Sequence, residues 1–142
     1  MIKMQVKSGD IEFRPRARLL KLIGAELISD DVVAVTELVK NAHDADASTV
    51  TITFNRVADP SGEITVIDDG LGMDIDTLLG RWMQPAGSSK VGADRRVTSK
   101  GRRVLGEKGL GRFSADKLAR HLELVSRPKG SSTEIRATFD WD

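Results

Sequence analysis

Residues 37–46 read Glu37-Leu38-Val39-Lys40-Asn41-Ala42-His43-Asp44-Ala45-Asp46. With the residues before them they predict an amphipathic helix over residues 31–46, because apolar side chains recur at three- and four-residue spacing (Val35, Leu38, Val39 and Ala42). Ser29, Asp30 and Asp31 supply the N-cap chemistry that starts such a helix.

The polar face of this helix is unusual. Glu37, Asn41 and Asp44 stand at i, i+4 and i+7 and share one face, and we place Lys40 off that face. Asn is a poor helix former in mid-helix, and Asp44 and Asp46 put negative charge where the helix dipole disfavours it. Local rules that are broken without visible compensation tend to mark functional sites. An ordinary solvated face is the alternative.

The spacing of this face suits phosphoryl chemistry. Glu37 can accept a proton from a water molecule, and the side-chain oxygen of Asn41, one turn further on, can bind a hard cation. Mg²⁺ prefers a few protein oxygens together with phosphate oxygens and water. A base and a metal ligand four residues apart would set an attacking water beside a terminal phosphate, as phosphoryl transfer requires.

A β-hairpin ending in a glycine cluster is predicted next. Residues 47–54 alternate, with Val50, Ile52 and Phe54 on the buried face, residues 63–67 form the return strand, and the turn between them is Asp59-Pro60-Ser61-Gly62. Directly after the hairpin comes the cluster Asp68-Asp69-Gly70-Leu71-Gly72-Met73.

This first glycine cluster can receive a purine base. The Asp68 carboxylate can accept a hydrogen bond from an exocyclic amine such as that of adenine. Gly70 and Gly72 would let the backbone approach a flat base, and Met73 would pack on a ring face. A simple strand-ending turn is the alternative.

A second glycine cluster, Gly106-Glu107-Lys108-Gly109-Leu110-Gly111, opens into a predicted helix over residues 113–120. Backbone N–H groups of such a loop, with a helix N-terminus behind them, form an anion site, and Lys108 adds a cation. The cluster is not a P-loop, because Glu107 stands where the Lys must be, nor is it a dinucleotide fingerprint. A glycine-rich turn that caps a helix is the alternative.

Residues 85–105 show little regular periodicity and are rich in Gly, Ser and Thr, so we expect a flexible lid. Residues 90–112 carry many Lys and Arg against Asp94 and Glu107. This charge suits a lid over a triphosphate. It also suits a nucleic acid, although the run lacks interleaved aromatic side chains for base stacking.

The remaining sequence completes an α/β domain. Pro15 opens a predicted helix over residues 15–27, Asp74 can cap a short helix, and strands are predicted at residues 121–126 and 133–139, with a turn at 128–130. These elements predict a two-layer α/β sandwich with a mixed, mainly antiparallel sheet and helices on one face.

Bulk composition excludes several classes of protein. The chain has 142 residues, a formal charge of +1 and no Cys, which fits one domain and excludes a disulfide framework or a thiolate metal site. No stretch resembles a signal peptide or a membrane span, so we expect a cytoplasmic protein. The sequence stops within a predicted strand, and we expect it to be an N-terminal fragment of a longer protein.

Taken in order, three clusters resemble the ATP-site boxes of the GHKL superfamily, which includes gyrase, the ninety-kilodalton heat-shock chaperones, sensor histidine kinases and MutL. The matching residues are Glu37-x-x-x-Asn41-x-x-Asp44-Ala45, Asp68-x-Gly70-x-Gly72 and Gly106-x-x-Gly109-x-Gly111. The resemblance implies the Bergerat ATP-binding fold for residues 1–142, with residues 85–105 as the ATP lid.

The same resemblance implies a role for each matching residue. Glu37 would be the general base, Asn41 the Mg²⁺ ligand and Asp68 the partner of the adenine amine. The other nucleotide-binding residues would be Asp44, Ala45, Gly70, Gly72 and Met73, then Ser88, Ser89 and Lys90 at the start of the lid, and Gly106, Lys108, Gly109, Leu110, Gly111, Arg112 and Phe113.

One position favours the hydrolases of the superfamily, because histidine kinases usually carry Asn where this chain has Glu37. Neither His43 nor His121 lies in a phosphoacceptor helix pair; we expect a local capping or pocket role for His43 and a strand start for His121. The resemblance thus implies a slow Mg²⁺-dependent ATPase whose lid closure drives dimerisation or a partner-facing change. A kinase-like domain that phosphorylates a partner, a nucleotide-binding module without hydrolysis and a DNA-binding loop are the alternatives.

Overall fold

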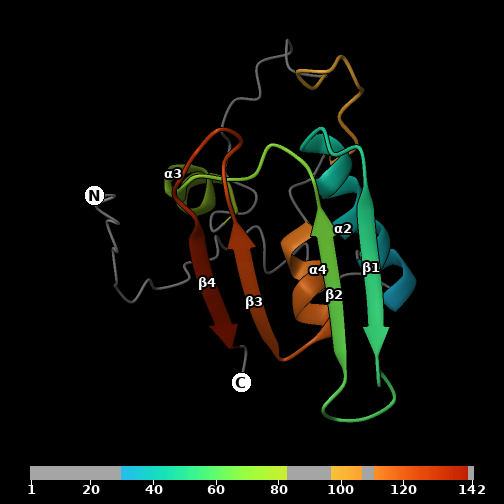
Figure 1. The fold of residues 1–142 in the computed structure, drawn as a ribbon. Helices are drawn as coiled ribbons and strands as arrows, with labels where there is room; N and C mark the ends of the chain where they lie inside the picture. Colours follow the sequence, from blue (N-terminus) through green and yellow to red (C-terminus); the bar gives the residue numbers. More distant parts are fainter. Residues whose placement is uncertain (1–29, 83–96, 107–110, 141–142) are drawn as a thin grey trace.

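Two β-hairpins and two main helices make up the described part of the computed structural model, which covers residues 30–82, 97–106 and 111–140 (Figure 1). The helix predicted over residues 15–27 lies outside it. The element order is α2, β1, β2, α3, η1, α4, β3 and β4.

Helix α2 (Asp31–Asp44) begins as its sequence predicts, because the side chain of Asp30 accepts a hydrogen bond from the backbone N–H of Val33 at 2.8 Å. It ends two residues before the predicted end. Asp46 lies outside the helix with φ of 60°, in the left-handed region. The buried residues of α2 are Ala34 and Ala42, and α2 packs against α4 (Gly111–Leu118).

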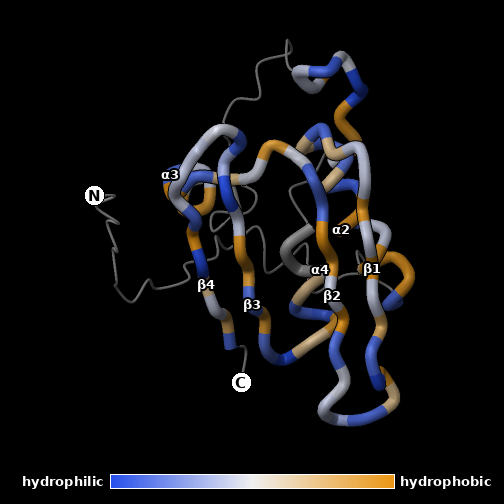
Figure 2. The backbone as a smooth tube through the Cα atoms, in the orientation of Figure 1, coloured by the Kyte–Doolittle hydropathy of each residue, from blue (hydrophilic) through white to orange (hydrophobic). Residues whose placement is uncertain are grey.

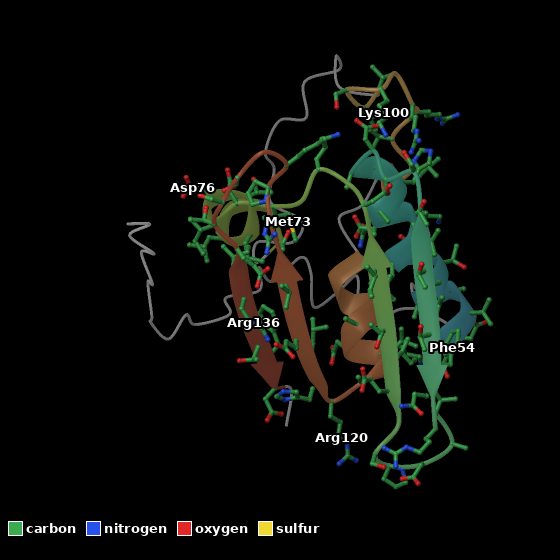
Figure 3. All side chains as sticks on the ribbon, viewed as in Figure 1. Phe54, Met73, Asp76, Lys100, Arg120 and Arg136 are labelled. Atoms are coloured by element: carbon green, nitrogen blue, oxygen red, sulfur yellow. The ribbon has the colours of Figure 1, made fainter. Side chains whose placement is uncertain are left out.

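Strands β1 (Val50–Asn55) and β2 (Glu63–Asp68) form the predicted antiparallel hairpin, with Val50 opposite Asp68. Its turn is held by Asp59, whose backbone oxygen accepts the Gly62 N–H at 2.8 Å. One expectation is wrong: Phe54 lies near the turn end of β1 (Figure 3) and is 56% exposed. Alternation predicts which side chains share a face, but it does not predict whether another element covers that face.

Strands β3 (His121–Ser126) and β4 (Ile135–Asp140) form a second antiparallel hairpin, and His121 starts its strand as expected. Figure 2 shows the alternation of polar and apolar residues that predicted both strands. The turn between them is closed by the Ser131 N–H, which donates to the Pro128 oxygen at 2.9 Å.

The predicted α/β fold class with mainly antiparallel strands is confirmed, and the structure adds how the strands are grouped. The described strands form two separate two-stranded antiparallel sheets, β1-β2 and β3-β4, because β2 and β3 are not hydrogen-bonded to each other. Figure 1 shows α2 and α4 together behind β1 and β2. The chain passes from β2 to β3 by way of α3 (Ile75–Thr77), the π-helical turn η1 (Leu78–Trp82) and α4.

The short helix α3 begins at the predicted cap, since the Asp74 side chain accepts the Thr77 N–H at 2.8 Å. Leu78, which follows it, is buried. Among the helices of the described ranges, none has the length and apolar character needed to cross a membrane.

Candidate functional site

Three segments that are far apart in the sequence meet at the C-terminal end of α2. The two carboxylate oxygens of Asp44 accept the backbone N–H groups of Leu105, at 2.9 Å, and Gly106, at 2.7 Å. The backbone oxygen of Ala45 accepts the Leu71 N–H at 2.8 Å. The acidic helix therefore touches both glycine clusters directly.

The contacts leave little room for a side chain at two glycines. A Cβ at Gly70 would lie 2.7 Å from the backbone oxygen of Ala45, and a Cβ at Gly106 would lie 2.9 Å from the Asp44 carboxylate. Both glycines therefore let one segment of the site approach another.

Glu37 and Asn41 lie on α2, one turn apart, as predicted. The Glu37 side chain is 21% exposed, and the Asn41 residue is exposed. Our placement of Lys40 away from this face is wrong: its Nζ lies 2.6 Å from Glu37 Oε1. The long Lys stem reaches back across one helical turn, so the cation partners one oxygen of the predicted base.

The acidic end of α2, which the helix dipole disfavours, has its own partners. Besides the two backbone N–H groups, His43 Nδ1 lies 3.2 Å from Asp44 Oδ1, in line with the expected local role of His43. The carboxylate of Asp44 thus holds the start of the second glycine cluster against α2. Backbone N–H donors offset the unfavourable position of its charge.

Asp46 is a site residue whose partners were not predicted. Only 2% of it is exposed, and its carboxylate accepts hydrogen bonds from Thr98 Oγ1, from Ser99 Oγ at 2.5 Å and from the Lys100 N–H at 3.1 Å. The one signal in the sequence is the adjacent hydroxyl residues Thr98 and Ser99, and it does not identify Asp46 as their partner.

Two cations of the basic run are also bound at this helix end. Lys100 Nζ donates to the Asp46 backbone oxygen at 2.7 Å and to Ser48 Oγ at 3.0 Å, and Arg102 Nη1 donates to the Ala47 oxygen. Figure 3 shows Lys100 beyond the C-terminal end of α2. Cations at this position suit both the free carbonyl groups and the helix dipole.

We predict an acid dependence of stability from Asp46. Burial raises the pKa of its carboxyl group, but hydrogen bonds from Ser99, Thr98 and Lys100 and the charge of Arg102 outweigh it and lower the pKa from 3.8 to about 2. Because the folded pKa is the lower one, the stabilisation is present above the unfolded pKa and is lost as pH falls toward 2.

The measurement is urea unfolding of the wild type and Asp46→Asn. The difference in free energy of unfolding should be constant above about pH 4 and should shrink as pH falls below it. If the two proteins differed in free energy of unfolding by the same amount at pH 5 and at pH 3, the lowered pKa of Asp46 would be contradicted.

The first glycine cluster is held on two sides. Asp68 Oδ1 accepts the Gly70 N–H at 2.9 Å, while the residue remains exposed. On the other side the Met73 N–H donates to Ser126 Oγ at 2.8 Å, and the Lys129 N–H donates to the Leu71 oxygen at 2.8 Å. The cluster therefore bridges the end of α2 and the turn between β3 and β4.

Asp69 is a second residue that the sequence did not identify. Its Oδ1 accepts the backbone N–H groups of Ser48 at 2.6 Å and Thr49 at 2.8 Å. The hydrogen bonds from Thr49 and Ser48 lower the pKa of this carboxyl group. Asp69 ties the first glycine cluster to the segment that leads into β1.

We predict that Gly72→Ala destabilises the fold. Gly72 has φ of +68°, and an added Cβ would lie 2.1 Å from the backbone oxygen of Arg127. The left-handed backbone costs a non-glycine residue about 1–2 kcal/mol, and the clash adds roughly 1–3 kcal/mol.

Gly130→Ala is the matched control for this prediction. Gly130 has φ of +80°, but an added Cβ would meet nothing within 4 Å. Gly130→Ala therefore carries only the cost of the left-handed backbone and no clash. Urea unfolding should show the larger loss of stability for Gly72→Ala, and equal losses would contradict the packing of the first cluster on Arg127.

Part of the predicted site lies outside the described residues. This applies to Ser88, Ser89, Lys90, Lys108, Gly109 and Leu110 and to most of the predicted lid. The backbones of Gly111, Arg112 and Phe113 form the first turn of α4. The described end of the lid, residues 97–106, includes an isolated antiparallel bridge between Val97 and Arg103.

The donor set fits a magnesium ion that is shared with a ligand. No group of three or more His, Cys, Asp or Glu side chains within the described ranges can hold a metal ion. Asp44 is engaged by backbone N–H groups, whereas Asn41 is exposed on α2. A site with one protein oxygen suits Mg²⁺ only where phosphate oxygens and water complete the coordination.

An acidic helix thus joins two glycine clusters at one helix end. The family described as histidine kinase-, DNA gyrase B- and HSP90-like ATPase matches residues 29–142, and the chain belongs to that family. The predicted superfamily is thereby confirmed. A comparison with curated proteins gave no match.

Proposed function

We propose that this domain binds Mg²⁺ and ATP beside the C-terminal half of α2 and hydrolyses ATP slowly to ADP and phosphate. The observation that carries the proposal is the set of contacts of Asp44 and Ala45, which join both glycine clusters to the helix of Glu37 and Asn41. One helix end thereby brings together groups suited to a base, a phosphate chain and a metal ion.

Each group has a distinct task in this proposal. Asp68 accepts a hydrogen bond from the adenine amine, with Gly70, Gly72 and Met73 beside the base. The segment from Gly106 to Phe113, where the chain enters α4, wraps the phosphates, and the backbone N–H groups after Gly106 bind them, because the Gly106 N–H donates to Asp44. Ser88, Ser89, Lys90, Lys108 and Arg112 complete the phosphate contacts.

Asn41 would hold Mg²⁺, which supplies charge neutralisation at the phosphates when it is bound. Glu37 takes the proton of the attacking water through its oxygen Oε2, because Oε1 is paired with Lys40. Lys40 and Glu37 lie on the same helix, so the ion pair is a local contact of α2 that leaves Oε2 unpaired within the described ranges.

The proposal extends to the use of the bound nucleotide. Residues 1–142 act as one ATP-binding domain, and residues 85–105 close over ATP. This closure drives dimerisation or a change that a partner recognises. A DNA-binding role for the basic run is not favoured, because Lys100 and Arg102 donate to oxygens of the chain itself.

The test uses ATP labelled at the γ-phosphate, with Mg²⁺, and three readouts. Release of free phosphate supports hydrolysis. Label on a protein added as an acceptor would replace the proposal by a kinase, and Mg²⁺-dependent binding without turnover would replace it by a nucleotide-binding regulatory module. The same reaction with EDTA in excess over Mg²⁺ is the control and should release no phosphate.

A further inference from the structure

The described end of the lid contains a turn, residues 97–103, that is held by its own backbone hydrogen bonds. The Thr98 N–H donates to the Arg102 oxygen at 2.7 Å, and the Gly101 N–H donates to the Thr98 oxygen at 2.9 Å. Val97 and Arg103 close the turn as an antiparallel bridge. Residues 97–103 are therefore one compact unit that can be held or released as a whole.

Two carboxylates at the end of α2 bind the described end of the lid, residues 97–106, at two points. Asp46 binds the turn itself, through Thr98, Ser99 and Lys100. Asp44 binds the chain a few residues further on, at Leu105 and Gly106. The two anchors are two residues apart on the chain, so both are fixed relative to Asn41 and Glu37.

Asp46 has a backbone conformation that serves this contact. Its φ of 60° is uncommon for a residue with a side chain, although Asp and Asn tolerate this region better than most. The residue is also nearly fully buried, and a buried carboxylate is tolerated only where hydrogen bonds or opposite charge compensate the lost hydration. Thr98, Ser99 and Lys100 provide those bonds.

We propose that Asp46 is a positioning residue for the phosphate site: by binding residues 98–100 it keeps Leu105 and Gly106 on Asp44 and so places the start of the second glycine cluster. The physical reason is conformational entropy. Without the Asp46 carboxylate the turn keeps only the side-chain bonds of Lys100 and Arg102 to this region, so Asp44 has to order more of the chain between Val97 and Gly106, and each residue so ordered costs free energy. The nucleotide part of this inference rests on the proposed function, whereas the structural part does not.

Amide hydrogen exchange tests the structural part without any nucleotide. Asp46→Gly removes the carboxylate and suits the left-handed backbone, so the substitution adds no backbone strain at that position. Asp46→Asn keeps the shape and one acceptor. The control is Asp59→Asn, which removes the charge of another carboxylate that binds a backbone N–H and a hydroxyl, both of Ser61, in the β1–β2 turn.

We expect the Lys100, Leu105 and Gly106 amides to exchange about tenfold faster or more in Asp46→Gly, relative to the amides of the β3–β4 ladder. Asp46→Asn should give an intermediate change, and Asp59→Asn should give none. The decisive amides are Leu105 and Gly106, because their acceptor Asp44 is not altered. Faster exchange confined to Lys100 would overturn the proposal, as would exchange that rises equally in the β3–β4 ladder of both Asp46 variants.

Calorimetric titration with ATP and with adenosine tests the nucleotide part. If Asp46 places the phosphate site, Asp46→Gly should weaken ATP binding about tenfold and leave adenosine binding nearly unchanged. Equal losses for ATP and adenosine would overturn the positioning role. Absence of ATP binding in the wild type would instead refute the proposed function, and the exchange experiment would still decide the role of Asp46.

Discussion

Glu37→Ala should lower ATP hydrolysis by about 10²–10⁴-fold and leave ATP binding intact. General-base catalysis is worth that much, and within the described ranges the Glu37 carboxylate forms its hydrogen bond and ion pair with Lys40. Steady-state phosphate release and calorimetric titration of ATP measure the two quantities separately. A lower rate with unchanged affinity is the signature of an interaction made in the transition state alone.

Lys40→Gln is the matched control for this prediction. It removes the ion pair and keeps the Glu37 carboxylate, so it separates loss of the base from loss of the pair. Hydrolysis should stay within about tenfold of the wild type, since a partly exposed pair within one helix contributes little to the placement of its members. If Glu37→Ala keeps its hydrolysis, Glu37 is not the base; if Lys40→Gln is as inactive as Glu37→Ala, the ion pair is the essential feature.

Asp68→Asn should weaken ATP binding by about 10–100-fold, because a hydrogen bond from the adenine amine to a charged acceptor is worth about 1.5–3 kcal/mol. Asp68 is exposed, and the one hydrogen bond of its side chain within the described ranges is the bond from the Gly70 N–H to Oδ1. The second oxygen is therefore available to a ligand. The wild type should also prefer ATP to GTP, whose base has an oxygen at the position of the adenine amine.

Asp69→Asn is the control for Asp68→Asn, since it makes the same chemical change at the adjacent residue. Asp69 binds the Ser48 and Thr49 N–H groups, so its substitution should lower the stability of the domain and leave the preference for ATP over GTP unchanged. Undiminished ATP affinity in Asp68→Asn would remove Asp68 from the base site. An equal effect of both substitutions on affinity would indicate a structural role for both carboxylates.

Local chemistry made much of this fold predictable. Asp30 and Asp74 each cap the helix that they were expected to cap, and Asp59 holds the expected turn between β1 and β2. Each of these interactions joins residues within three positions, and a side chain at a fixed offset from a backbone N–H leaves a readable pattern in the sequence. The strands were predictable for the same reason, because the alternation of polar and apolar residues is also a short-range pattern.

The contacts that assemble the site were not predictable in this way. Asp46 binds residues more than fifty positions away, and Asp69 binds Ser48 and Thr49 some twenty positions before it. Nothing in the spacing along the chain fixes such pairs. The sequence did mark Asp46 as unusual, because a negative charge at the end of α2 opposes the helix dipole. It did not indicate the partners of Asp46, which come from another segment.

Three further differences from the prediction have the same origin. The position of Lys40 on the helix predicts where its Cα lies, whereas its long stem decides that the ammonium group reaches Glu37. The alternation in β1 predicts the face of Phe54, whereas its exposure depends on which elements cover that face. The separation of the strands into two sheets likewise depends on tertiary packing rather than on local pattern.

The central claim is that one helix end joins a base site, a phosphate site and a metal ligand into a single ATP site. Isothermal titration of the domain with ATP, first with Mg²⁺ and then with excess EDTA, tests it most directly. We predict saturable binding of one ATP per chain that weakens when Mg²⁺ is removed. Titration up to millimolar ATP with no saturable heat in the presence of Mg²⁺, together with no displacement of a fluorescent ATP analogue, would contradict the claim.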